Sequence, residues 1–341
     1  MPNRLSQVLR GSLDPDDVES SVDAHERSFG FGPHNGRDRR MADHLAFAEN
    51  YYDLATDLYE YGWGQSFHFA PRVPGESHPA SIARQQHHFA LKLGLRPGMR
   101  VADLGCGVGG PLREIARFSG SQIVGVNINA YQLGRAVEYT EAAGLSHLGT
   151  YVESDFTAID EPDESFDAVY AIDATCHAPD RVDVFSEALR LLKPGGCFAS
   201  HEWCLTGRFD AGSAHHRQLK HDIELGAGLQ DLVSVQKVDA ALDRVGFEVL
   251  EASDMADQAG PAIAWYEPLV GSGLSLTSLR SSPAGRAATY QTLRVLEALR
   301  VVPRGTPGAA RILNTGAAAL AESGRLGIFT PMYFVLARKP A

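Results

Sequence analysis

The sequence lacks any apolar run that approaches the roughly 18 residues needed to span a bilayer. Its first residues, MPNRLSQVLRGSLDPDD, also lack the apolar core of a signal peptide. Basic residues are scarce relative to acidic ones, 31 against 42, and the formal net charge is -11. A chain of this charge repels phosphate backbones, so we expect no nucleic-acid partner and no strongly charged membrane-binding surface. We expect a cytoplasmic protein, for which transient peripheral membrane contact stays open.

Cysteine is also scarce, with four residues at Cys106, Cys176, Cys197 and Cys204. None belongs to a CxxC pair, so neither a zinc site nor a disulfide framework is indicated. Reduced thiols are typical of a cytosolic protein. We therefore expect no metal cofactor.

From residue 100 onward, short apolar segments alternate with stretches of helical length. The apolar segments are RVADLG, QIVGVN, GTYVES, FDAVYAI, CFASHEW, FEVLEASDM and the terminal TPMYFVLARKP. Alternation of this kind predicts a mostly parallel, seven-stranded α/β sheet with helices on both faces. We divide the 341 residues into an N-terminal cap (1–80), a central core (81–256) and a C-terminal elaboration (257–341) that contains the last strand.

The N-terminal cap combines helices with an aromatic loop. Asp14, followed by Pro15, predicts the start of a short helix, and Ser81 predicts the cap of another helix that ends near Gly94. Apolar residues at helical spacing predict a helix over 44–61. Its acidic stripe, which includes Asp53 and Asp57, reads as a solvated face. The segment YGWGQSFHFAPRVPGES then predicts a loop.

A glycine-rich turn follows the first predicted strand of the core, in the segment DLGCGVGGP (103–111). Gly105, Gly107 and Gly110 fit the spacing of a dinucleotide fingerprint, so this pattern alone is ambiguous. Asp103 before the first glycine, and two further strands after the five-strand run, favour a methyl donor instead. The segment resembles motif I of the class I methyltransferases, which implies a Rossmann-like core. The resemblance also implies a site for S-adenosylmethionine (giving S-adenosylhomocysteine as product) that includes Cys106 and Gly109.

Polar residues follow the second and third predicted strands. The second strand leads into Asn127, Asn129 and Gln132, where a carboxylate usually binds the ribose hydroxyls; amide oxygens can accept the same hydrogen bonds. The missing carboxylate weakens the dinucleotide interpretation. Asp155 and Phe156 match the position that contacts adenine. Tight turning or helix capping would explain each residue singly, but not all of them in register over three strands.

Other segments indicate the methyl acceptor. TDLYEYGWGQSFHFAPR, GCGVGGPLREIARFSG, YAIDATCHAPDR, the HEW segment with HRQLKHDIELGAGL, and FTPMYFVLARKP resemble the sterol C24-methyltransferases from about residue 45 to the C-terminus. The resemblance implies that a sterol side-chain alkene is methylated at C24. A C25 carbocation, a hydride shift and loss of a proton would give a 24-methylene product. It also implies that the N-terminal helices and the C-terminal helical insertion form the substrate cavity.

Aromatic faces and carboxylates suit that chemistry, because they stabilise a cation without quenching it. The aromatic candidates for substrate binding are Tyr59, Tyr61, Trp63, Phe67 and Phe69, although Tyr59 also reads as ordinary core. The carboxylate candidates are Glu60, Asp173, Glu202 and Glu224, with Glu60 favoured by its place beside the aromatic loop. Asp173 ends the fourth strand, where ligands bind in open α/β sheets, so it is a cofactor candidate as well. His68 and His177 are candidate proton acceptors.

Several positions depart from the family pattern: Ala130, Asp173, His201 and Ala227 stand where the family commonly has an acid, Glu, Tyr and Asp. These departures put the preferred acceptor in doubt, and another terpenoid alkene, or a phenol or amine, stays open. A non-catalytic binder of sterol or cofactor is the alternative of a different class, and an NAD-dependent oxidoreductase is disfavoured. We expect a homo-oligomer that acts on a lipophilic small molecule.

Overall fold

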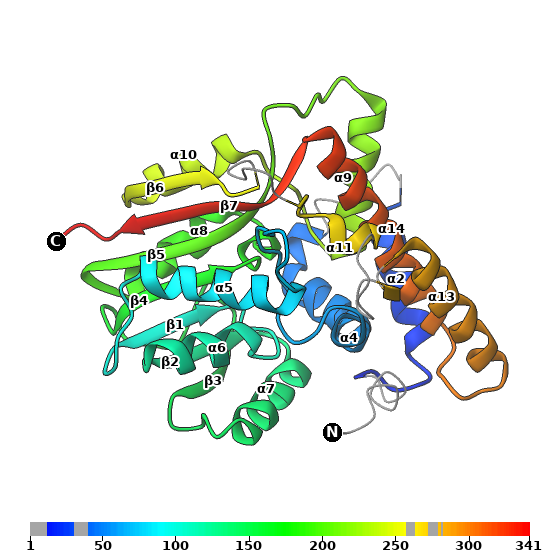
Figure 1. The fold of residues 1–341 in the computed structure, drawn as a ribbon, viewed down its shortest axis with the longest axis horizontal. Helices are drawn as coiled ribbons and strands as arrows, with labels where there is room; N and C mark the ends of the chain where they lie inside the picture. Colours follow the sequence, from blue (N-terminus) through cyan, green and yellow to red (C-terminus); the bar gives the residue numbers. More distant parts are fainter. Residues whose placement is uncertain (1–11, 31–39, 257–262, 272–278, 281) are drawn as a thin grey trace. The chain divides into compact units, whose positions relative to one another are not determined.

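The computed structural model describes residues 12–30, 40–256, 263–271, 279–280 and 282–341 (Figure 1). The chain divides into two compact units. A sheet unit contains residues 65–207, 233–265 and 329–341, and a helical unit contains the rest of the chain. The described part of the region predicted as a C-terminal elaboration is helical until the last strand, as expected.

The sheet unit contains the seven predicted strands. They are β1 (Arg100–Leu104), β2 (Gln122–Asn127), β3 (Gly149–Glu153), β4 (Phe166–Ile172), β5 (Leu192–Leu205), β6 (Glu248–Asp254) and β7 (Phe329–Arg338). Their order is β3-β2-β1-β4-β5-β7-β6, and β7 alone runs antiparallel to its neighbours β5 and β6. The mostly parallel sheet is therefore confirmed. The segment LKPGG (192–196) forms the start of β5, where the register shifts between the Phe166–Leu192 and Ala168–Cys197 pairs.

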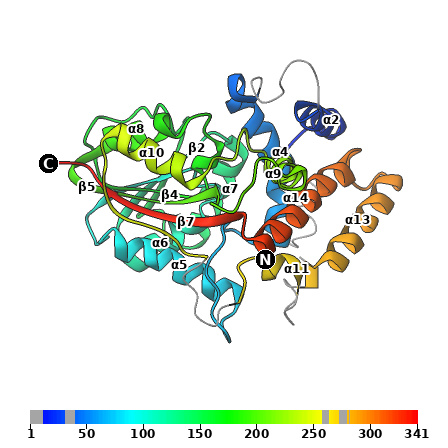
Figure 2. The same cartoon turned by 90° about the horizontal axis from the view of Figure 1, so that it is seen from above.

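Helices cover both faces of the sheet, as Figure 2 shows from above. One face carries α8 (Arg181–Leu191) and α10 (Val235–Val245), and the other carries α5 (His78–Lys92) and α6 (Gly110–Ser119). The remaining helix, α7 (Ala130–Ala142), packs against β2 and β3. A three-residue helix, η1 (Thr175–His177), follows β4. This layering places the loops after β1, β2, β3 and β4 at the carboxyl edge of the parallel strands, where open α/β sheets bind ligands.

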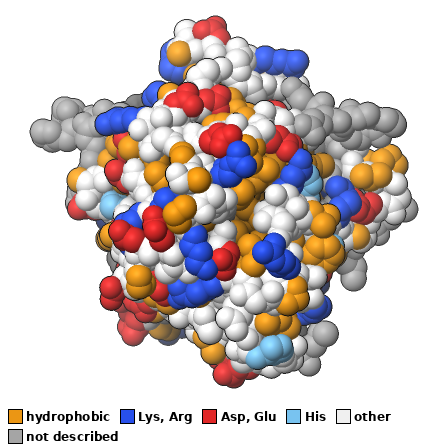
Figure 3. Space-filling model, turned by 90° about the vertical axis from the view of Figure 1, so that its left-hand side faces the viewer, with side chains coloured by type: hydrophobic (Ala, Val, Ile, Leu, Met, Phe, Trp, Pro, Cys, Tyr) orange, Lys and Arg blue, Asp and Glu red, His pale blue; other side chains and the backbone are white. Residues whose placement is uncertain are grey.

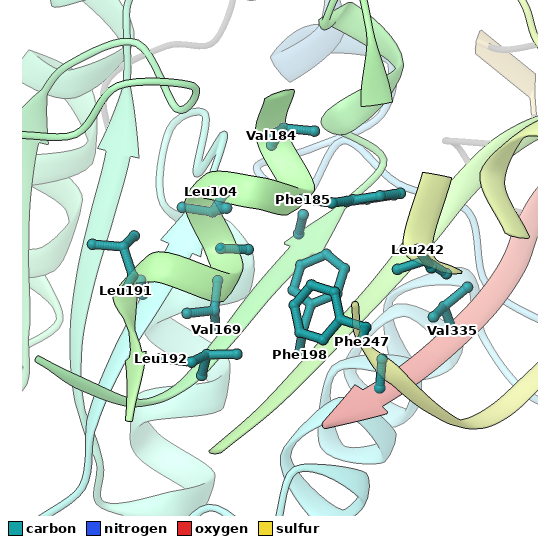
Figure 4. Packing of buried hydrophobic residues seen from close by; sticks show 14 of the residues in the cluster. Leu104, Val169, Val184, Phe185, Leu191, Leu192, Phe198, Leu242, Phe247 and Val335 are labelled. Carbon is teal, nitrogen blue, oxygen red and sulfur yellow. The ribbon is translucent and has the colours of Figure 1, made fainter. Parts of the chain in front are cut away.

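Alternation along the strands divides the core into two layers. Val169 and Ala171 of β4 pack toward α8 and α10, whereas Ala168 and Tyr170 pack toward α5 and α6. Burying apolar area on both faces stabilises a parallel sheet, which explains its continuous apolar strands. Figure 4 shows the layer under α8 and α10, including Leu104, Val169, Val184, Phe185, Leu191, Leu192, Phe198, Leu242, Phe247 and Val335.

Two predicted helix starts were wrong. Helix α5 begins at His78, and its cap is Ser77, whose hydroxyl accepts a hydrogen bond from the Ala80 N–H at 3.3 Å. Ser81 lies inside the first turn, where its hydroxyl donates to the His78 carbonyl. Asp14 instead begins a turn in which its carbonyl accepts from the Asp17 N–H, and α2 (Val18–Ser28) starts after this turn. Asp and Ser favour local turns as well as helix caps, so their presence in the sequence did not distinguish the two.

The helical unit contains α2, α4 (His44–Gly62), α9 (Ala214–Ala227), α11 (Glu267–Val270), α13 (Pro283–Ala298) and α14 (Thr306–Leu326). Helix α14 packs most extensively on α9. Gly316 of α14 and Gly226 of α9 meet backbone to backbone, and a Cβ on Gly316 would lie 2.8 Å from the Gly226 Cα. Two glycines thus permit a helix approach that larger side chains would prevent.

The predicted helix over 44–61 is confirmed as α4 (His44–Gly62), but its acidic stripe differs from the prediction. Its acidic stripe is not a uniformly solvated face, because Asp57 and Glu60 are buried while Glu49 is exposed. The stripe crosses from solvent into the packed side along the helix, which spacing alone does not reveal.

Charges of both signs are interspersed on the face that Figure 3 shows. Exposed ion pairs of the sheet unit include Lys193–Asp167, Arg338–Glu248 and Lys339–Glu164. Exposed pairs of this kind contribute at most about 1 kcal/mol each. Among the helices that the structure describes, none is both long and apolar enough to cross a membrane.

Candidate cofactor and acceptor site

The glycine loop (residues 105–110) connects β1 to α6. Gly105 has φ +76°, and a Cβ there would overlap the Ala174 Cβ of the turn after β4. Gly105 and Cys106 donate their backbone N–H groups to the Val126 carbonyl of β2. The Cys106 side chain is buried, and burial raises the pKa of its thiol well above the usual range. The loop is thus fixed to the neighbouring strands, and Cys106 serves it through its backbone and packing.

A strap (residues 65–69) crosses the start of α6. The Gln65 backbone lies so close to Gly110 that a Cβ on Gly110 would overlap the Gln65 carbonyl. The Gln65 side chain accepts a hydrogen bond from Arg113 Nη2 at 2.8 Å, and Arg113 Nη1 donates to the Val108 carbonyl. By contrast, the nearest atom to a Cβ on Gly107 would be a Phe67 ring carbon at 3.8 Å. A Cβ on Gly107 would therefore meet the Phe67 ring at ordinary van der Waals distance, without the overlap that Gly105 and Gly110 would suffer.

Asp103 lies at the end of β1, just before the glycine loop. Its side chain is buried, and one carboxyl oxygen (Oδ2) has no hydrogen-bond partner among the described residues. Burial raises the pKa of Asp103 to about 7, against a smaller lowering by the Tyr170 hydroxyl. An isolated buried carboxylate is costly, and a cationic partner lowers that cost, so this side chain has the chemistry to pair with a bound cation.

The three amide residues after β2 form a small buried network. Asn127 Nδ2 donates to Gln132 Oε1 at 2.7 Å, and Asn127 Oδ1 accepts from the Ile128 N–H. Asn129 caps α7 by accepting from the Gln132 N–H at 2.8 Å. The network holds the predicted ribose side chains in fixed orientations at the carboxyl end of β2.

Asp155 and Phe156 lie in the segment that follows β3. Asp155 Oδ1 accepts from the Thr157 N–H at 2.9 Å, which shapes the turn. A ring carbon of Phe156 would lie 3.9 Å from a Cβ on Gly105. The fold therefore brings the predicted stacking face beside the glycine loop.

Asp173 begins the turn after β4 (residues 173–178) with a left-handed backbone, φ +55°. Non-glycine residues in this region are uncommon, and they cluster at functional sites. Its Oδ2 accepts from the Phe69 N–H of the strap at 3.2 Å. Burial raises the pKa of Asp173 well above its usual range, an effect opposed by Trp203 and the Phe69 N–H. Asp173 thus connects the strap to the turn that packs on Gly105.

The 173–178 turn rests on a buried ion pair. Arg181 Nε donates to Glu202 Oε2 at 3.3 Å, and Thr175 donates its hydroxyl to the same oxygen. Burial raises the pKa of Glu202, while Arg181 opposes the shift. Arg181 also donates to the Ala178 carbonyl. His177, in the same turn, is buried. Glu202 therefore lies beneath the turn that carries Asp173 and His177.

Two adjacent glutamines of α5, which the sequence analysis did not single out, each contact a buried histidine. Gln86 Nε2 donates to His68 Nε2 at 2.8 Å and to Ser66 Oγ at 3.0 Å. His68 Nδ1 donates to the Phe69 carbonyl at 2.8 Å, so both ring nitrogens are engaged. Gln85 Nε2 donates to His201 Nε2 at 2.9 Å. Burial lowers the pKa of His68 to about 4 and the pKa of His201 well below its usual range. Both rings are therefore neutral near pH 7.

Phe69 belongs to an aromatic quartet with Trp203, Trp265 and Phe329. Its ring centroid lies 5.9 Å from that of Trp203 and 5.0 Å from that of Trp265. Phe329 lies 5.4 Å from Trp203 and 5.9 Å from Trp265, which closes the set. Sequence reasoning found only Phe69, because the other three come from segments distant in sequence. Trp203 lies near the end of β5 and Phe329 begins β7, whereas Trp265 lies in a turn and carries no such sequence signal.

Four further predicted acceptor residues, Tyr59, Glu60, Tyr61 and Trp63, lie in the helical unit, whereas Phe67 lies in the strap of the sheet unit. Tyr59 shares a hydrogen bond with the Tyr51 hydroxyl at 2.7 Å, and the Arg280 guanidinium lies 4.8 Å from the centre of the Tyr61 ring. Trp63 is half-buried at the C-cap of α4, and Glu60 is buried one turn earlier. The structure thus places Tyr59, Glu60 and Tyr61 on one helical turn.

Glu224, in α9, is committed to local contacts. Its Oε1 accepts from the Leu232 N–H at 2.8 Å and forms an ion pair with Lys220, which also pairs with Asp231. Burial raises the pKa of Glu224, and Lys220 opposes that shift. Glu224 thereby ties the end of α9 to the segment that follows.

Family models and relatives agree with this geometry. The model described as a methyltransferase domain matches residues 102–200, and the model described as sterol methyltransferase C-terminal matches residues 276–341. The cycloartenol-C-24-methyltransferase of Arabidopsis thaliana is 46% identical over 98% of this chain and 99% of its own length. A sterol 24-C-methyltransferase of Saccharomyces cerevisiae is 42% identical over 90% of this chain and 82% of its own.

Solved structures agree on the fold. A mycolic acid cyclopropane synthase, solved with SAH and CTAB, superposes with a TM-score of 0.68 at 17% identity, covering 87% of this chain and 98% of its own. Fold and site together define a Rossmann-like, S-adenosylmethionine-dependent methyltransferase. Within that class, the chain belongs to the sterol C24-methyltransferase family.

Proposed function

We propose that this enzyme methylates the side-chain alkene of a sterol at C24 and releases a 24-methylene sterol. The observation that carries the proposal is the similarity over nearly the whole chain to the cycloartenol-C-24-methyltransferase of Arabidopsis thaliana, with 46% identity. The reaction transfers a methyl cation to carbon, so the site must bind a cationic donor and protect a carbocation from water.

The residues around the glycine loop fit S-adenosylmethionine, which supplies an electrophilic methyl group on a sulfonium when bound. The unpartnered Asp103 oxygen would accept from the donor's ammonium group, and the absence of a side chain at Gly107 would let a ligand approach the backbone of the loop. We assign the ribose hydroxyls to the Asn127, Asn129 and Gln132 network. Asp155 and Phe156 would contact the adenine amino group and ring.

Stabilising the C25 cation falls to aromatic rings and carboxylates. A desolvated ring stabilises a cation by up to about 2 kcal/mol. We propose that the aromatic quartet does so together with Tyr59, Tyr61, Trp63 and Phe67. Glu60 and Asp173 are the first carboxylate candidates. Glu202 and Glu224 would act at longer range, because Arg181 and Lys220 already compensate their charges.

A hydride shift from C24 to C25 moves the cation to C24, and the last step, loss of a proton from the new methyl group, then needs only a weak base. His68 would first have to give up its hydrogen bond with Gln86, which raises the cost of accepting a proton. We propose His177, which is buried in the turn after β4, and His68 as the candidate proton acceptors.

The test is an assay with labelled S-adenosylmethionine, a panel of Δ24 sterols, and prenyl, phenol and amine acceptors, with products analysed by mass spectrometry. The proposal predicts a sterol heavier by one CH2 group, with a 24(28) double bond. Transfer only to acceptors other than sterols would overturn it and would favour the alternative that the departures at Ala130, His201 and Ala227 leave open.

Glu60→Gln is the sharpest single variant. If Glu60 stabilises the cation, the variant lowers kcat by roughly tenfold or more while the Kd for S-adenosylmethionine stays unchanged. Glu49→Gln, on the exposed part of the same helix, is the matched control and should retain kcat. Equal kcat in the two variants would reduce Glu60 to a structural residue.

The wider organisation follows from the same assignment. We propose that residues 1–80 and 257–341 contribute the acceptor side and residues 81–256 the cofactor side, in a cytoplasmic homo-oligomer without a bound metal. Size-exclusion chromatography with light scattering tests the oligomeric state, and metal analysis of the purified protein tests the statement about the metal.

A further inference from the structure

His201 is a fully buried histidine of β5 that stands where the family commonly has Tyr. Its ring lies edge-on to Phe89 of α5, with 4.9 Å between ring centroids, and to Phe334 of β7, with 6.0 Å. A polar ring in such apolar surroundings is costly unless its nitrogens have partners. The partners of the two ring nitrogens therefore indicate what this residue does.

Gln85 determines which nitrogen of the ring carries the proton. Gln85 Nε2 lies 2.9 Å from His201 Nε2, and it also donates to Met255 Sδ at 3.3 Å. These two acceptors assign the orientation of the amide, because an amide nitrogen donates and cannot accept. His201 Nε2 is therefore the acceptor, and the proton of the neutral ring is on Nδ1.

This Nδ1–H faces Asp173, in the turn after β4. His201 Nδ1 lies 3.8 Å from Asp173 Oδ1, and neither atom forms a hydrogen bond with a residue that the structure describes. The backbone keeps the two residues together, since the Asp173 N–H donates to the His201 carbonyl at 3.3 Å. The other carboxyl oxygen, Oδ2, accepts from the Phe69 N–H. A closure of less than about 1 Å would bring Nδ1 and Oδ1 within hydrogen-bond distance.

We propose that His201 is a positioning residue for Asp173, whose carboxyl group it holds oriented and ionised by donating from Nδ1 to Oδ1 when a cation is present. A hydrogen bond to the charged form of a carboxyl group favours that form, which burial alone would disfavour. The part of this inference that concerns methyl transfer rests on the proposed function, in which Asp173 helps to stabilise the C25 cation. His201 acts through Asp173 and need not touch the reacting atoms.

The other groups around Asp173 leave room for this role. Trp203 lies on the same face of β5 as His201, two residues further on, and its side chain also favours the ionised carboxylate. The charge of Glu202 acts in the opposite direction and raises the pKa of Asp173. Cys176 is close as well, but burial raises the pKa of its thiol and keeps it neutral. Two N–H donors of one strand thus offset the effect of burial on Asp173.

His201 is suited to this task because its ring stays uncharged. Burial lowers its pKa well below the usual range, and His68 and His88 lower it further as like charges. A protonated ring would place a positive charge beside the carbocation that the carboxylate is to stabilise. A neutral ring donates the hydrogen bond without that repulsion.

Two amide variants test the proposal. Asn carries its amide nitrogen about as far from the backbone as His Nδ1, whereas Gln carries it about as far as His Nε2. His201→Asn should therefore retain kcat. His201→Gln should lower kcat at pH 7 by roughly tenfold, because a hydrogen bond to a carboxylate changes its ionisation by a factor of this order. The acidic limb of the pH profile of kcat should move to higher pH by about one pH unit in His201→Gln.

A second readout needs no methyl transfer. Carbon-13 NMR of protein labelled at the aspartate carboxyl carbons measures the pKa of Asp173, and Asp173→Asn assigns its resonance. This pKa should rise in His201→Gln and stay at the parent value in His201→Asn. His201→Phe, which keeps a ring between Phe89 and Phe334, should behave as His201→Gln does and guards against a variant that fails to fold.

His87→Gln is the matched control, because His87 stacks on Phe118 and pairs with Glu114 on the other side of α5 from this contact. It should leave both readouts unchanged. The proposal falls if His201→Gln and His201→Phe leave the pKa of Asp173 unchanged, or if His201→Asn shifts it as much as His201→Gln does. A packing role alone would not separate the two amides.

A double variant checks that His201 acts through Asp173. In the Asp173→Asn background, His201→Gln should cause no further loss of kcat, and a further tenfold loss would assign its effect to another group. If the parent protein methylates no sterol, the proposed function falls. The NMR titration still decides whether His201 controls the ionisation of Asp173.

Discussion

Asp103 illustrates how one buried side chain couples proton binding to ligand binding. Burial raises its pKa to about 7, so the free protein holds a proton there through the acidic range. In the folded protein this raised pKa contributes stability at low pH that is lost as the pH rises through about 7. An ammonium partner favours the ionised carboxylate, so binding the cofactor must expel that proton below pH 7.

The affinity for S-adenosylmethionine should therefore fall as the pH is lowered from 7 to 5.5, by up to about tenfold per pH unit. Isothermal titration calorimetry in buffers of different ionisation enthalpy measures both the Kd and the proton released. The Asp103→Asn variant should bind S-adenosylmethionine more weakly at neutral pH, and its binding should release one proton fewer below pH 7. An unchanged slope in that variant would assign the titration to another group, such as Asp173.

Gly107 and Gly105 differ in what a side chain would meet. A Cβ on Gly107 would make only an ordinary contact with Phe67 at 3.8 Å, whereas a Cβ on Gly105 would overlap Ala174. Gly107→Leu should therefore weaken cofactor binding by at least about a hundredfold and lower stability only by the cost of the left-handed backbone, about 1 kcal/mol. Equilibrium dialysis and thermal denaturation measure the two effects.

Gly134→Ala is the control for Gly107→Leu, because Gly134 lies on α7 with nothing within 4 Å of an added Cβ. That variant should bind the cofactor normally and gain up to about 1 kcal/mol in stability. Unchanged cofactor affinity in Gly107→Leu would mean that the ligand does not approach this part of the loop.

At the scale of the element, helices meet through small residues and through paired polar side chains. Gln85 and Gln86 come from one turn of α5 but reach different partners, His201 on β5 and His68 on the strap. The sequence showed only two adjacent glutamines in a helix, and no periodicity could identify their partners. The nearness of β5 and the strap to α5 is a property of the folded chain.

The α9–α14 contact yields a prediction for stability. In Gly316→Val, the Cβ of the new side chain would lie 2.8 Å from the Gly226 Cα, so the two helices must separate. We expect a loss of roughly 1–3 kcal/mol in the free energy of unfolding, measured by urea denaturation. Ala318→Val, at an exposed position of the same helix, should cost less than about 1 kcal/mol. Equal losses in both variants would attribute the effect to helix propensity alone.

At the scale of the whole molecule, a ligand that binds only the folded chain raises its melting temperature. S-adenosylhomocysteine at about a hundred times its Kd should stabilise the protein by roughly 2.7 kcal/mol. NAD at the same concentration should leave the melting temperature unchanged, although the glycine spacing fits both ligands. Differential scanning fluorimetry measures the shift, and an equal shift with NAD would contradict the assignment of the glycine loop to a methyl donor.

The seven strands, the glycine loop and the family could all be predicted from the amino-acid sequence, because strand alternation and loop glycines are local properties that short segments carry. The same reasoning predicted Asp103 and Asn127 near the ends of β1 and β2 and Phe156 in the turn after β3, since parallel strands end at one edge of the sheet. Which side chains meet became visible in the folded chain alone. Folding buried Asp57 and Glu60, engaged both nitrogens of His68, and joined Phe69 to Trp203, Trp265 and Phe329. Contacts between distant segments depend on packing, which no local pattern encodes.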